Sequence, residues 1–559
     1  MTRNFISTAR SEQSYKLYNG NLFPRKQFGD ADAKIEWVHD LSQSYHTFVH
    51  TESYDIFKEK SALFILGRRG TGKTAMMRML DYEISKNKNL SYSYSKIILQ
   101  EEIFPKLTSS IRGEAFSNSS RDELRDMIKD KWDWIISTSA MIAVCRKEVV
   151  NGSSSESLKK VYKFLDSQNL LPDEHDFDLE SPLLIAWNTL ENELNQIDYN
   201  PVKVTLAVTR TMRGLFTPTF KEARKELMTF LSQTVRNVII LIDSKETYKY
   251  DDEKSDVVVS ALMEAVLDVY ARAPKTRIYA KVAFPSEMYP HFTTENKGKT
   301  VGKTHFIMWR YKDIISLIAK RYYNMLHESG VPNGKYGFRE LDDFKKAKNF
   351  LSEIFPLRIE TFSGISFDTM SYIIGHTQKK PRQIIQMFNI LLTLAKKNNI
   401  PINNVSEICI KEGVNIKLEV LTEEAYDIYK DIFPDADKII MKTFKNSINI
   451  LKLNDIHLKL KESSDLIKRN NMDRERATRL FLECGIIGVL KSEEALLEKK
   501  SLIKAKFEYQ IKDVITINNN DTLVIHPMFY QPLGILADNN SIVHPMPTED
   551  EREEQELLV

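Results

Sequence analysis

Residues 62–74 read ALFILGRRGTGKT and decide the fold class of this chain. An apolar run of strand length leads directly into Gly67-x-x-x-x-Gly72-Lys73-Thr74, and a helical pattern, AMMRMLDYEISK, follows it. The glycines let the backbone turn tightly, so that consecutive N–H groups and the helix N-terminus converge on phosphate oxygens. Strand, glycine-rich loop and helix together form the Walker A pattern. The stretch therefore predicts an α/β fold with a nucleoside triphosphate site, in preference to an ordinary glycine turn beside a buried strand.

The residue types in this loop suggest roles for individual side chains. Lys73 is expected to reach the β- and γ-phosphates, and the Thr74 hydroxyl is expected to ligate Mg²⁺. The predicted cofactors are therefore ATP and Mg²⁺. The predicted nucleotide-binding residues are Gly67, Arg68, Arg69, Gly70, Thr71, Gly72, Lys73, Thr74 and Ala75.

A second apolar run, VIILID, ends in Asp243. A Mg²⁺-dependent NTPase needs a carboxylate at the end of a neighbouring buried strand to hold the metal and its water shell. We therefore predict that Asp243 is the second metal-binding residue. The alternative is a helix N-cap or a strand-end turn that holds no ligand.

Hydrolysis also requires a group that orients and deprotonates water. Asp243 is followed by Ser244, where many ATPases have a glutamate, and Glu246 is the nearest acid. Glu246 is our candidate general base; the alternative is an exposed acid stabilised by the dipole at a helix start. A serine at 244 predicts slow hydrolysis, and with it a nucleotide-gated switch rather than a motor.

Two downstream positions are further candidates for the phosphate site. Ser286 follows the strand pattern TRIYAKVAFP, where a strand end faces the γ-phosphate, although a surface turn is the alternative. Arg382 follows Pro381 in KKPRQIIQMFN, and proline fits the first turn of a helix. The helix dipole disfavours an arginine at this end, so we interpret Arg382 as facing a phosphate. The alternative is an exposed basic helix start.

Composition excludes few functions but bounds the setting. The 559 residues carry 79 basic and 77 acidic side chains, a net charge of +2, so any nucleic-acid contact requires local patches. The three cysteines are isolated in the sequence, which favours a reducing, cytoplasmic setting over a disulfide framework or zinc site. The sequence contains no apolar run of 18 residues and no signal-peptide pattern, so no membrane association is expected.

The alternation of strand and helix patterns predicts several domains. We expect an N-terminal arm at 1–27, a P-loop ATPase core with a parallel sheet at 28–311 containing a large helical insertion at about 101–234, a helical segment at 312–420, a mixed segment of short helices and strands at 421–540 and an acidic tail at 541–559. The family resemblance given next implies that 312–420 is a helical lid and 421–540 a winged-helix domain.

In this order, the motifs FGDADAKIEW, FILGRRGTGKTA, IILIDSKETY, IMWRYKDIISLIAKR and KKPRQIIQMFN resemble a known family. They are similar to bacterial P-loop ATPases of the AAA+/STAND assemblage, close to the ORC-like ATPases and often encoded in anti-phage defence or mobile-element loci. The resemblance implies that residues 28–36 border the adenine and that Arg382 is the "sensor 2" arginine of the lid. Arg321 matches a recurrent arginine of these families whose role the resemblance leaves open.

The same resemblance implies a winged helix after the lid. Residues 454–490 predict helices ending at a glycine turn, and the strands KFEYQI and TLVIHPMF are expected to follow. In a DNA-binding winged helix, a basic helix enters the major groove and the wing contacts phosphates. The residues that fit these contacts are Arg474, Arg476, Arg479, Lys499, Lys500, Lys504 and Lys506. Acidic neighbours interrupt the patch, so a protein-docking role is the alternative.

Three functions remain open at this point. The first is an ATP-driven oligomerisation switch, a homo-oligomer that regulates an effector protein encoded nearby, in anti-phage defence. The second is a DNA-binding AAA+ ATPase of the transposition or replication-loader type. The third is an ATP-binding regulator with essentially no turnover.

Overall fold

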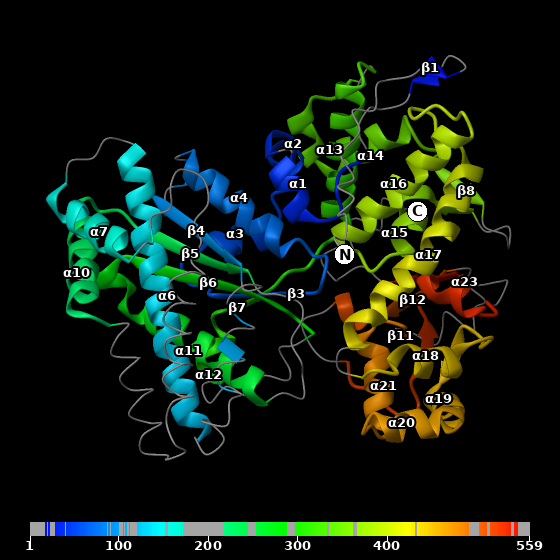
Figure 1. The fold of residues 1–559 in the computed structure, drawn as a ribbon. Coiled ribbons are helices and arrows are strands. Elements are labelled where there is room, and N and C mark those ends of the chain that lie inside the picture. The colour runs from blue at the N-terminus through cyan, green and yellow to red at the C-terminus, as the bar shows by residue number, and fades with distance from the viewer. Residues whose placement is uncertain are drawn as a thin grey trace, which may run out of the picture. The chain divides into compact units, whose positions relative to one another are not determined.

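The computed structural model divides the chain into two compact units (Figure 1). The first comprises Met1–Thr51, Arg68–Gly72 and Met308–Val559, and the second comprises Glu52–Gly67 and Lys73–Ile307. The structure describes residues 17–18, 21–22, 28–39, 41–86, 88–89, 91–99, 104, 107–108, 111, 120–150, 155–168, 170, 216–243, 253–287, 297–331, 335–360, 366–430, 433–490, 502–510, 515–537 and 542–545.

The second unit is built on a five-stranded parallel sheet. Its strands, in spatial order, are β4 (Tyr94–Leu99), β5 (Val238–Asp243), β6 (Ile278–Pro285), β3 (Phe64–Gly67) and β7 (Thr304–Phe306). Both β3 and β5 are buried along their whole length. Parallel strands that are covered on both faces form continuous apolar runs, which is why these two were visible in the sequence. The predicted α/β class with a parallel sheet is confirmed.

Helices cover this sheet on both sides (Figure 1). Figure 1 shows α3 and α4 on one side of the strands and α6 and α11 on the other. The helices of the second unit are α3 (Glu52–Lys58), α4 (Lys73–Ser85), α6 (Arg121–Val150), α7 (Glu156–Ser167), α10 (Pro218–Gln233), α11 (Glu253–Thr276) and α12 (Lys297–Val301). Three of them, α6, α7 and α10, belong to the predicted helical insertion.

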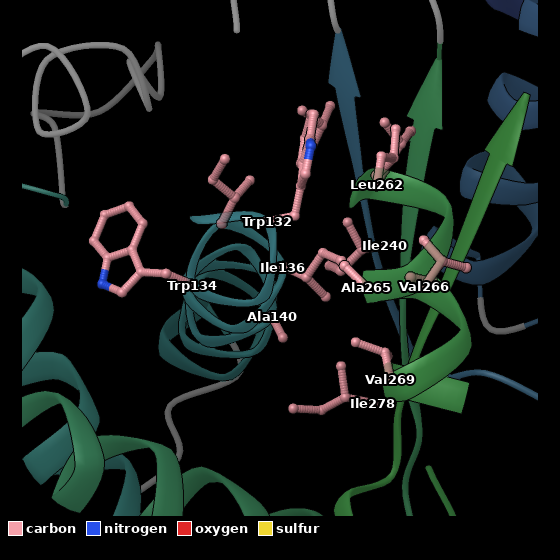
Figure 2. Close-up of a cluster of buried hydrophobic side chains, with 14 of the residues drawn as sticks. Trp132, Trp134, Ile136, Ala140, Ile240, Leu262, Ala265, Val266, Val269 and Ile278 are labelled. Atoms are coloured by element: carbon pink, nitrogen blue, oxygen red, sulfur yellow. The ribbon is translucent and has the colours of Figure 1, made fainter. Parts of the chain in front are cut away.

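The helix α6 is part of the main core of the second unit. Figure 2 shows Trp132 and Ile136 on the side of α6 that faces Ile240 of β5 and the apolar face of α11. Trp134 points to the opposite side, where its ring stacks on Phe220 of α10 with centroids 6.3 Å apart. Apolar residues that recur every three or four positions along α6 therefore pack on two faces of this helix. The insertion is consequently fixed to the sheet by a shared core.

An ion-pair cluster also joins the insertion to α11. Asp133 of α6 accepts a hydrogen bond from Arg224 of α10 at 2.9 Å and another from Arg272 of α11. One carboxylate thus bridges guanidinium groups from two helices, and it fixes the orientation of three helices relative to each other.

The first unit contains the N-terminal segment and the predicted lid. Its elements up to residue 430 are β1 (Leu17–Tyr18), β2 (Asn21–Leu22), α1 (Ala33–His39), α2 (Leu41–Thr47), α13 (Tyr311–Glu328), a 3₁₀ helix (Phe338–Asp342), α14 (Phe344–Ser352), β8 (Arg358–Glu360), β9 (Ser366–Asp368), α15 (Thr369–Gly375), α16 (Pro381–Lys397) and α17 (Glu407–Lys430). The helix α17 continues through residue 420, where the sequence predicted a domain boundary.

Aromatic rings form the centre of this helical part. Phe28 stacks on Phe388 of α16 with centroids 4.9 Å apart, and Tyr322 of α13 packs against Phe355 at 5.2 Å. The Tyr322 hydroxyl donates to the Ile402 carbonyl at 2.8 Å, so its buried polar end is satisfied. Residue 28, distant in sequence, is therefore held by the lid helices.

The C-terminal part of the first unit is winged-helix-like, as predicted. A five-stranded sheet in the order β10-β13-β11-β12-β14 packs with short helices, and each pairing is antiparallel except β12 with β14. The elements are α18 (Ala436–Phe444), β10 (Ile450–Lys452), α19 (Leu453–Lys459), a 3₁₀ helix (Leu460–Ser463), α20 (Ser464–Arg469), α21 (Arg474–Glu483), β11 (Ile487–Leu490), β12 (Leu502–Lys506), a 3₁₀ helix (Glu508–Gln510), β13 (Thr522–Ile525), a 3₁₀ helix (Pro527–Phe529), α23 (Tyr530–Leu533) and β14 (Ile542–Pro545).

The extent of two predicted strands in this part was wrong. The strand expected at KFEYQI lies earlier, at Leu502–Lys506, and a 3₁₀ turn follows in which the Gln510 side chain accepts the Phe507 N–H at 3.0 Å. The strand expected at TLVIHPMF ends at Ile525, and Pro527 begins a 3₁₀ helix because proline lacks the N–H that a ladder requires. None of the helices in the described residues has the length and apolar character needed to cross a bilayer.

Candidate nucleotide-binding site

The glycine-rich loop lies where the sequence predicted it, between β3 and α4. In the second unit, the Lys73 ammonium donates to the Gly67 carbonyl at 2.7 Å, at the point where the strand ends and the helix begins. The same carbonyl accepts the Ser286 N–H at 3.2 Å. Within the loop, Gly70 and Gly72 have φ angles of 84° and 94°, which side-chain-bearing residues rarely adopt. The glycines at positions 70 and 72 are therefore required by the positive φ angles of the loop.

Thr74 and Asp243 come together in the second unit. The Thr74 hydroxyl donates to Asp243 Oδ2 at 2.7 Å, although the two residues are 169 positions apart. Asp243 is buried at the end of β5. The two residues predicted to bind the metal are thus in contact, with two oxygen atoms side by side.

The expectation that the carboxylate comes from the strand next to β3 was wrong. The neighbours of β3 are β6 and β7, and β5 lies beyond β6. Two strand spacings amount to about 10 Å, a distance that the first turn of α4, carrying Thr74, crosses. The order of strands depends on long-range pairing, which an apolar run does not encode.

In the first unit, several carbonyls of the loop are tied to protein donors. The Arg68 carbonyl accepts the Thr71 N–H at 3.1 Å and the Thr71 hydroxyl at 2.7 Å. The Gly70 carbonyl accepts the Arg382 N–H at 3.3 Å, and the Thr71 carbonyl accepts the Trp309 indole N–H at 2.8 Å. The loop conformation is therefore set by contacts outside the strand and helix that flank it.

Arg382 lies against the glycine-rich loop. A β-carbon built on Gly70 would be 3.0 Å from the Arg382 β-carbon, and Arg382 Nε donates to the Ala31 carbonyl at 3.3 Å. Pro381 occupies the first position of α16, as predicted. Lys379, just before it, has a positive φ of 52°, which is uncommon for a residue with a side chain. The arginine therefore contacts both the loop and the segment that the resemblance assigned to the adenine.

A buried ion pair holds that segment, residues 28–36. Arg321 Nη1 and Nη2 donate to the two carboxylate oxygens of Glu36 at 2.7 and 2.9 Å, and Nη1 also reaches the Phe28 carbonyl at 3.2 Å. The Asn389 side chain accepts the Phe28 N–H and donates to the Gly29 carbonyl, both at 2.9 Å. Arg321 therefore has a positioning role that the sequence left open.

Ser286 lies in the turn directly after β6, and its N–H donates a hydrogen bond to the Gly67 carbonyl. The next residue, Glu287, is a buried acid that no motif in the sequence marks. Ser244 and Glu246, the position without an acid and the candidate general base, lie outside the described residues. The base therefore stays a prediction.

Part of the predicted DNA-binding patch has partners within the protein. Arg476 bonds Glu483 at 3.0 Å, and Arg479 bonds Glu483 at 3.2 Å and the Ile515 carbonyl at 3.2 Å. Arg474 is exposed, as are Lys504 and Lys506, which alternate with buried residues on β12. Lys499 and Lys500 lie outside the described residues. Arg474, Lys504 and Lys506 are therefore the members of the predicted patch that are exposed among the described residues, and the DNA-binding patch stays a prediction.

The C-terminal part also contacts the lid close to Arg382. Gln378 lies in the turn that precedes Pro381, and its Nε2 donates to the Cys484 carbonyl at 2.6 Å. Arg68 of the glycine-rich loop lies over the Tyr509 ring, 5.9 Å from its centroid, and the Tyr509 hydroxyl bonds His526 Nε2 at 2.7 Å. The loop and the winged-helix-like part are thus linked by direct contact.

Comparison with known proteins finds one family model that is similar to part of this chain. Residues 32–103, which include the segment up to the end of β4 and the whole glycine-rich loop, match the family model described as ORC-CDC6-like. The ORC-like part of the sequence resemblance is therefore borne out over this stretch. No curated protein matches the chain.

Two solved structures align with much of the chain at low sequence identity. The ORC2 protein of Aeropyrum pernix, described as ADPNP–ADP complexes, has 10% identity over 77% of this chain and 81% of its own, with a TM-score of 0.33. Cdc6p from Pyrobaculum aerophilum has 10% identity over 84% of this chain and 86% of its own, with a TM-score of 0.25.

Proposed function

We propose that the chain binds ATP with Mg²⁺ at Gly67–Thr74 and acts as a nucleotide-driven switch of the AAA+ type. The observation that carries the proposal is the contact between Thr74 and Asp243, where a hydroxyl and a carboxylate oxygen lie 2.7 Å apart. Adjacent oxygen ligands of an octahedral Mg²⁺ are about 3 Å apart, given metal–oxygen distances near 2.1 Å. The pair therefore fits the metal that a triphosphate requires.

The residues of the loop supply the remaining chemistry. Lys73 bonds the Gly67 carbonyl at 2.7 Å, and its ammonium would exchange that carbonyl for a phosphate oxygen. Bound Mg²⁺ would neutralise phosphate charge. Arg382 contacts Gly70 and offers a second cation beside the loop, which fits a residue that responds to the phosphates.

Contacts of the loop support a switch in preference to a passive binder. Arg68 touches Tyr509, and Gln378, four residues before Arg382, bonds Cys484, so the winged-helix-like part is joined to elements that contact the phosphate loop. A change of the loop on nucleotide binding would reach that part directly. We propose that ATP thereby favours a homo-oligomer that engages a separate effector protein. The setting in a reducing cytoplasm and in anti-phage defence rests only on the sequence resemblance and composition.

The binding step is tested by titrating the protein with ATP in the presence and absence of Mg²⁺. Lys73→Ala is expected to abolish triphosphate binding, and Lys86→Ala, at an exposed lysine following the same helix, is the matched control that retains it. Wild-type protein with no measurable affinity for Mg–ATP would refute the proposal.

The switch is tested separately by light scattering at fixed protein concentration with ATP, with ADP and without nucleotide. An increase in mass with ATP alone is expected, and an unchanged mass in all three conditions contradicts the switch. A DNA-binding ATPase is the second candidate, since Arg474, Lys504 and Lys506 are exposed. It predicts hydrolysis stimulated by duplex DNA and binding that weakens steeply with salt.

A further inference from the structure

We propose that Trp309 is a positioning residue for phosphate recognition, because its indole fixes the direction of a loop N–H group. The inference rests on the proposed binding of a nucleotide at this loop and adds a residue that the Walker A pattern does not contain. It concerns only residues of the first unit.

The contact is a direct hydrogen bond to the loop backbone. Trp309 Nε1 donates to the Thr71 carbonyl at 2.8 Å, and the indole ring also approaches Gly72, since a β-carbon there would lie 4.0 Å from Cζ2. Trp309 is located just beyond β7 and two residues before α13 begins.

Peptide geometry turns this contact into control of a phosphate-binding group. The Thr71 carbonyl and the Gly72 N–H belong to one planar trans peptide, so they point in opposite directions. While the carbonyl is held by Trp309, the Gly72 N–H faces away from the indole. In Walker A loops the N–H groups bind phosphate oxygens. Trp309 therefore holds the Gly72 N–H in its phosphate-facing orientation before the ligand arrives.

Arg382 acts on the preceding part of the same loop through its backbone. Its N–H bonds the Gly70 carbonyl at 3.3 Å, longer than the 2.8 Å of the Trp309 bond. Within the first unit, the carbonyls of two consecutive loop residues, Gly70 and Thr71, thus accept hydrogen bonds from Arg382 and Trp309. Gly72 has no β-carbon and adopts a φ of 94°, so its side chain does not restrict the rotation of this peptide and the Trp309 bond is what fixes it.

The test is Trp309→Phe, which keeps an aromatic ring and removes the donor. One net hydrogen bond corresponds to about two- to tenfold in affinity, so ATP and inorganic tripolyphosphate are both expected to bind that much more weakly. Affinity for adenosine, which has no phosphate, is expected to stay unchanged. The matched control is Trp132→Phe, at a buried indole whose N–H has no hydrogen-bond partner among the described residues.

The outcomes separate the inference from the proposed function. Wild-type protein that binds neither ATP nor tripolyphosphate refutes the nucleotide site itself. Wild-type binding with unchanged affinity in Trp309→Phe overturns the positioning role alone, and so does an equal loss of adenosine affinity.

A second measurement is made on the wild-type protein, and a variant serves only to assign one signal. In wild-type protein labelled with ¹⁵N-tryptophan, one of five indole signals, assigned with Trp309→Tyr, is expected to shift on adding tripolyphosphate. If no indole signal moves at saturation, the inference is overturned.

Discussion

Replacing Arg321 with methionine tests how much the buried ion pair between Arg321 and Glu36 stabilises the first unit. The substitution removes three hydrogen bonds, two to Glu36 and one to the Phe28 carbonyl, and leaves the Glu36 carboxylate buried. The side chains of Arg321 and Glu36 are only 8% and 5% exposed, so water solvates the unpaired Glu36 carboxylate poorly in the variant. Breaking a buried pair from one side costs about 3–5 kcal/mol.

The assay must report on the first unit locally, because a chain with two compact units need not unfold in one step. Hydrogen exchange of α1 and α13, followed by mass spectrometry, meets this need. A loss of about 3–5 kcal/mol corresponds to an increase of a hundredfold or more in the exchange rate of amides that open together there. Arg339→Met, at an exposed arginine of the same unit, is the control and is expected to change stability by less than about 0.5 kcal/mol.

The double variant Glu36→Leu with Arg321→Met sharpens the test. With both charges removed, no unpaired carboxylate remains, so protection is expected to recover part of the loss. An exchange increase below about fivefold in Arg321→Met, or a double variant less protected than the single one, would refute this reasoning. Affinity for adenosine is expected to fall with protection if residues 28–36 border the base.

Three further predictions follow from other contacts. Asp243→Ala is expected to abolish the Mg²⁺ dependence of ATP binding, since Thr74 loses its carboxylate partner; titration with and without the metal measures it, and a retained dependence contradicts the metal site. Gly70→Ala is expected to weaken ATP binding at least tenfold, because φ is 84° and a β-carbon would lie 3.0 Å from that of Arg382; an unchanged affinity would show that the loop adapts. Burial lowers the pKa of Lys281 to about 7 from 10.5. Between these values the unfolded chain holds more protons than the folded one, so this lysine adds stability as pH rises, by at most about 1.4 kcal/mol per unit. Denaturant unfolding at pH 7.5 and 9 is expected to show a larger gain for wild type than for Lys281→Met, and equal gains would contradict it.

Local sequence patterns were sufficient for the elements that carry the site. Apolar runs ending in Gly67 and in Asp243 predicted buried strands. A strand that is covered on both faces has apolar residues at successive positions, because neither face is open to solvent. Pro381 predicted the start of α16 for a similarly local reason, its fixed φ and missing N–H. These features depend on a few adjacent residues.

Features that depend on pairing across the chain were missed or wrong. The sequence did not indicate that β6 separates β3 from β5, since strand order follows from packing of whole helices against the sheet. It gave no role to Arg321, whose partner Glu36 is 285 positions away, and no signal marked Trp309. A tryptophan within an apolar run is predicted to be a core residue, and its role as a hydrogen-bond donor becomes clear only when the structure shows the indole N–H facing a carbonyl.

The amino-acid sequence alone is sufficient to predict a Walker A loop on a buried strand, because the spacing of the glycines and the apolar run reflect local backbone geometry. The residues that surround that loop become known only from the folded structure. Arg382, Trp309 and Tyr509 reach it from positions that are 238 residues or more away, Trp309 being the nearest in sequence to its partner Thr71. Such contacts form only when separate elements pack together, and their hydrogen bonds and charges leave no periodic trace in the sequence.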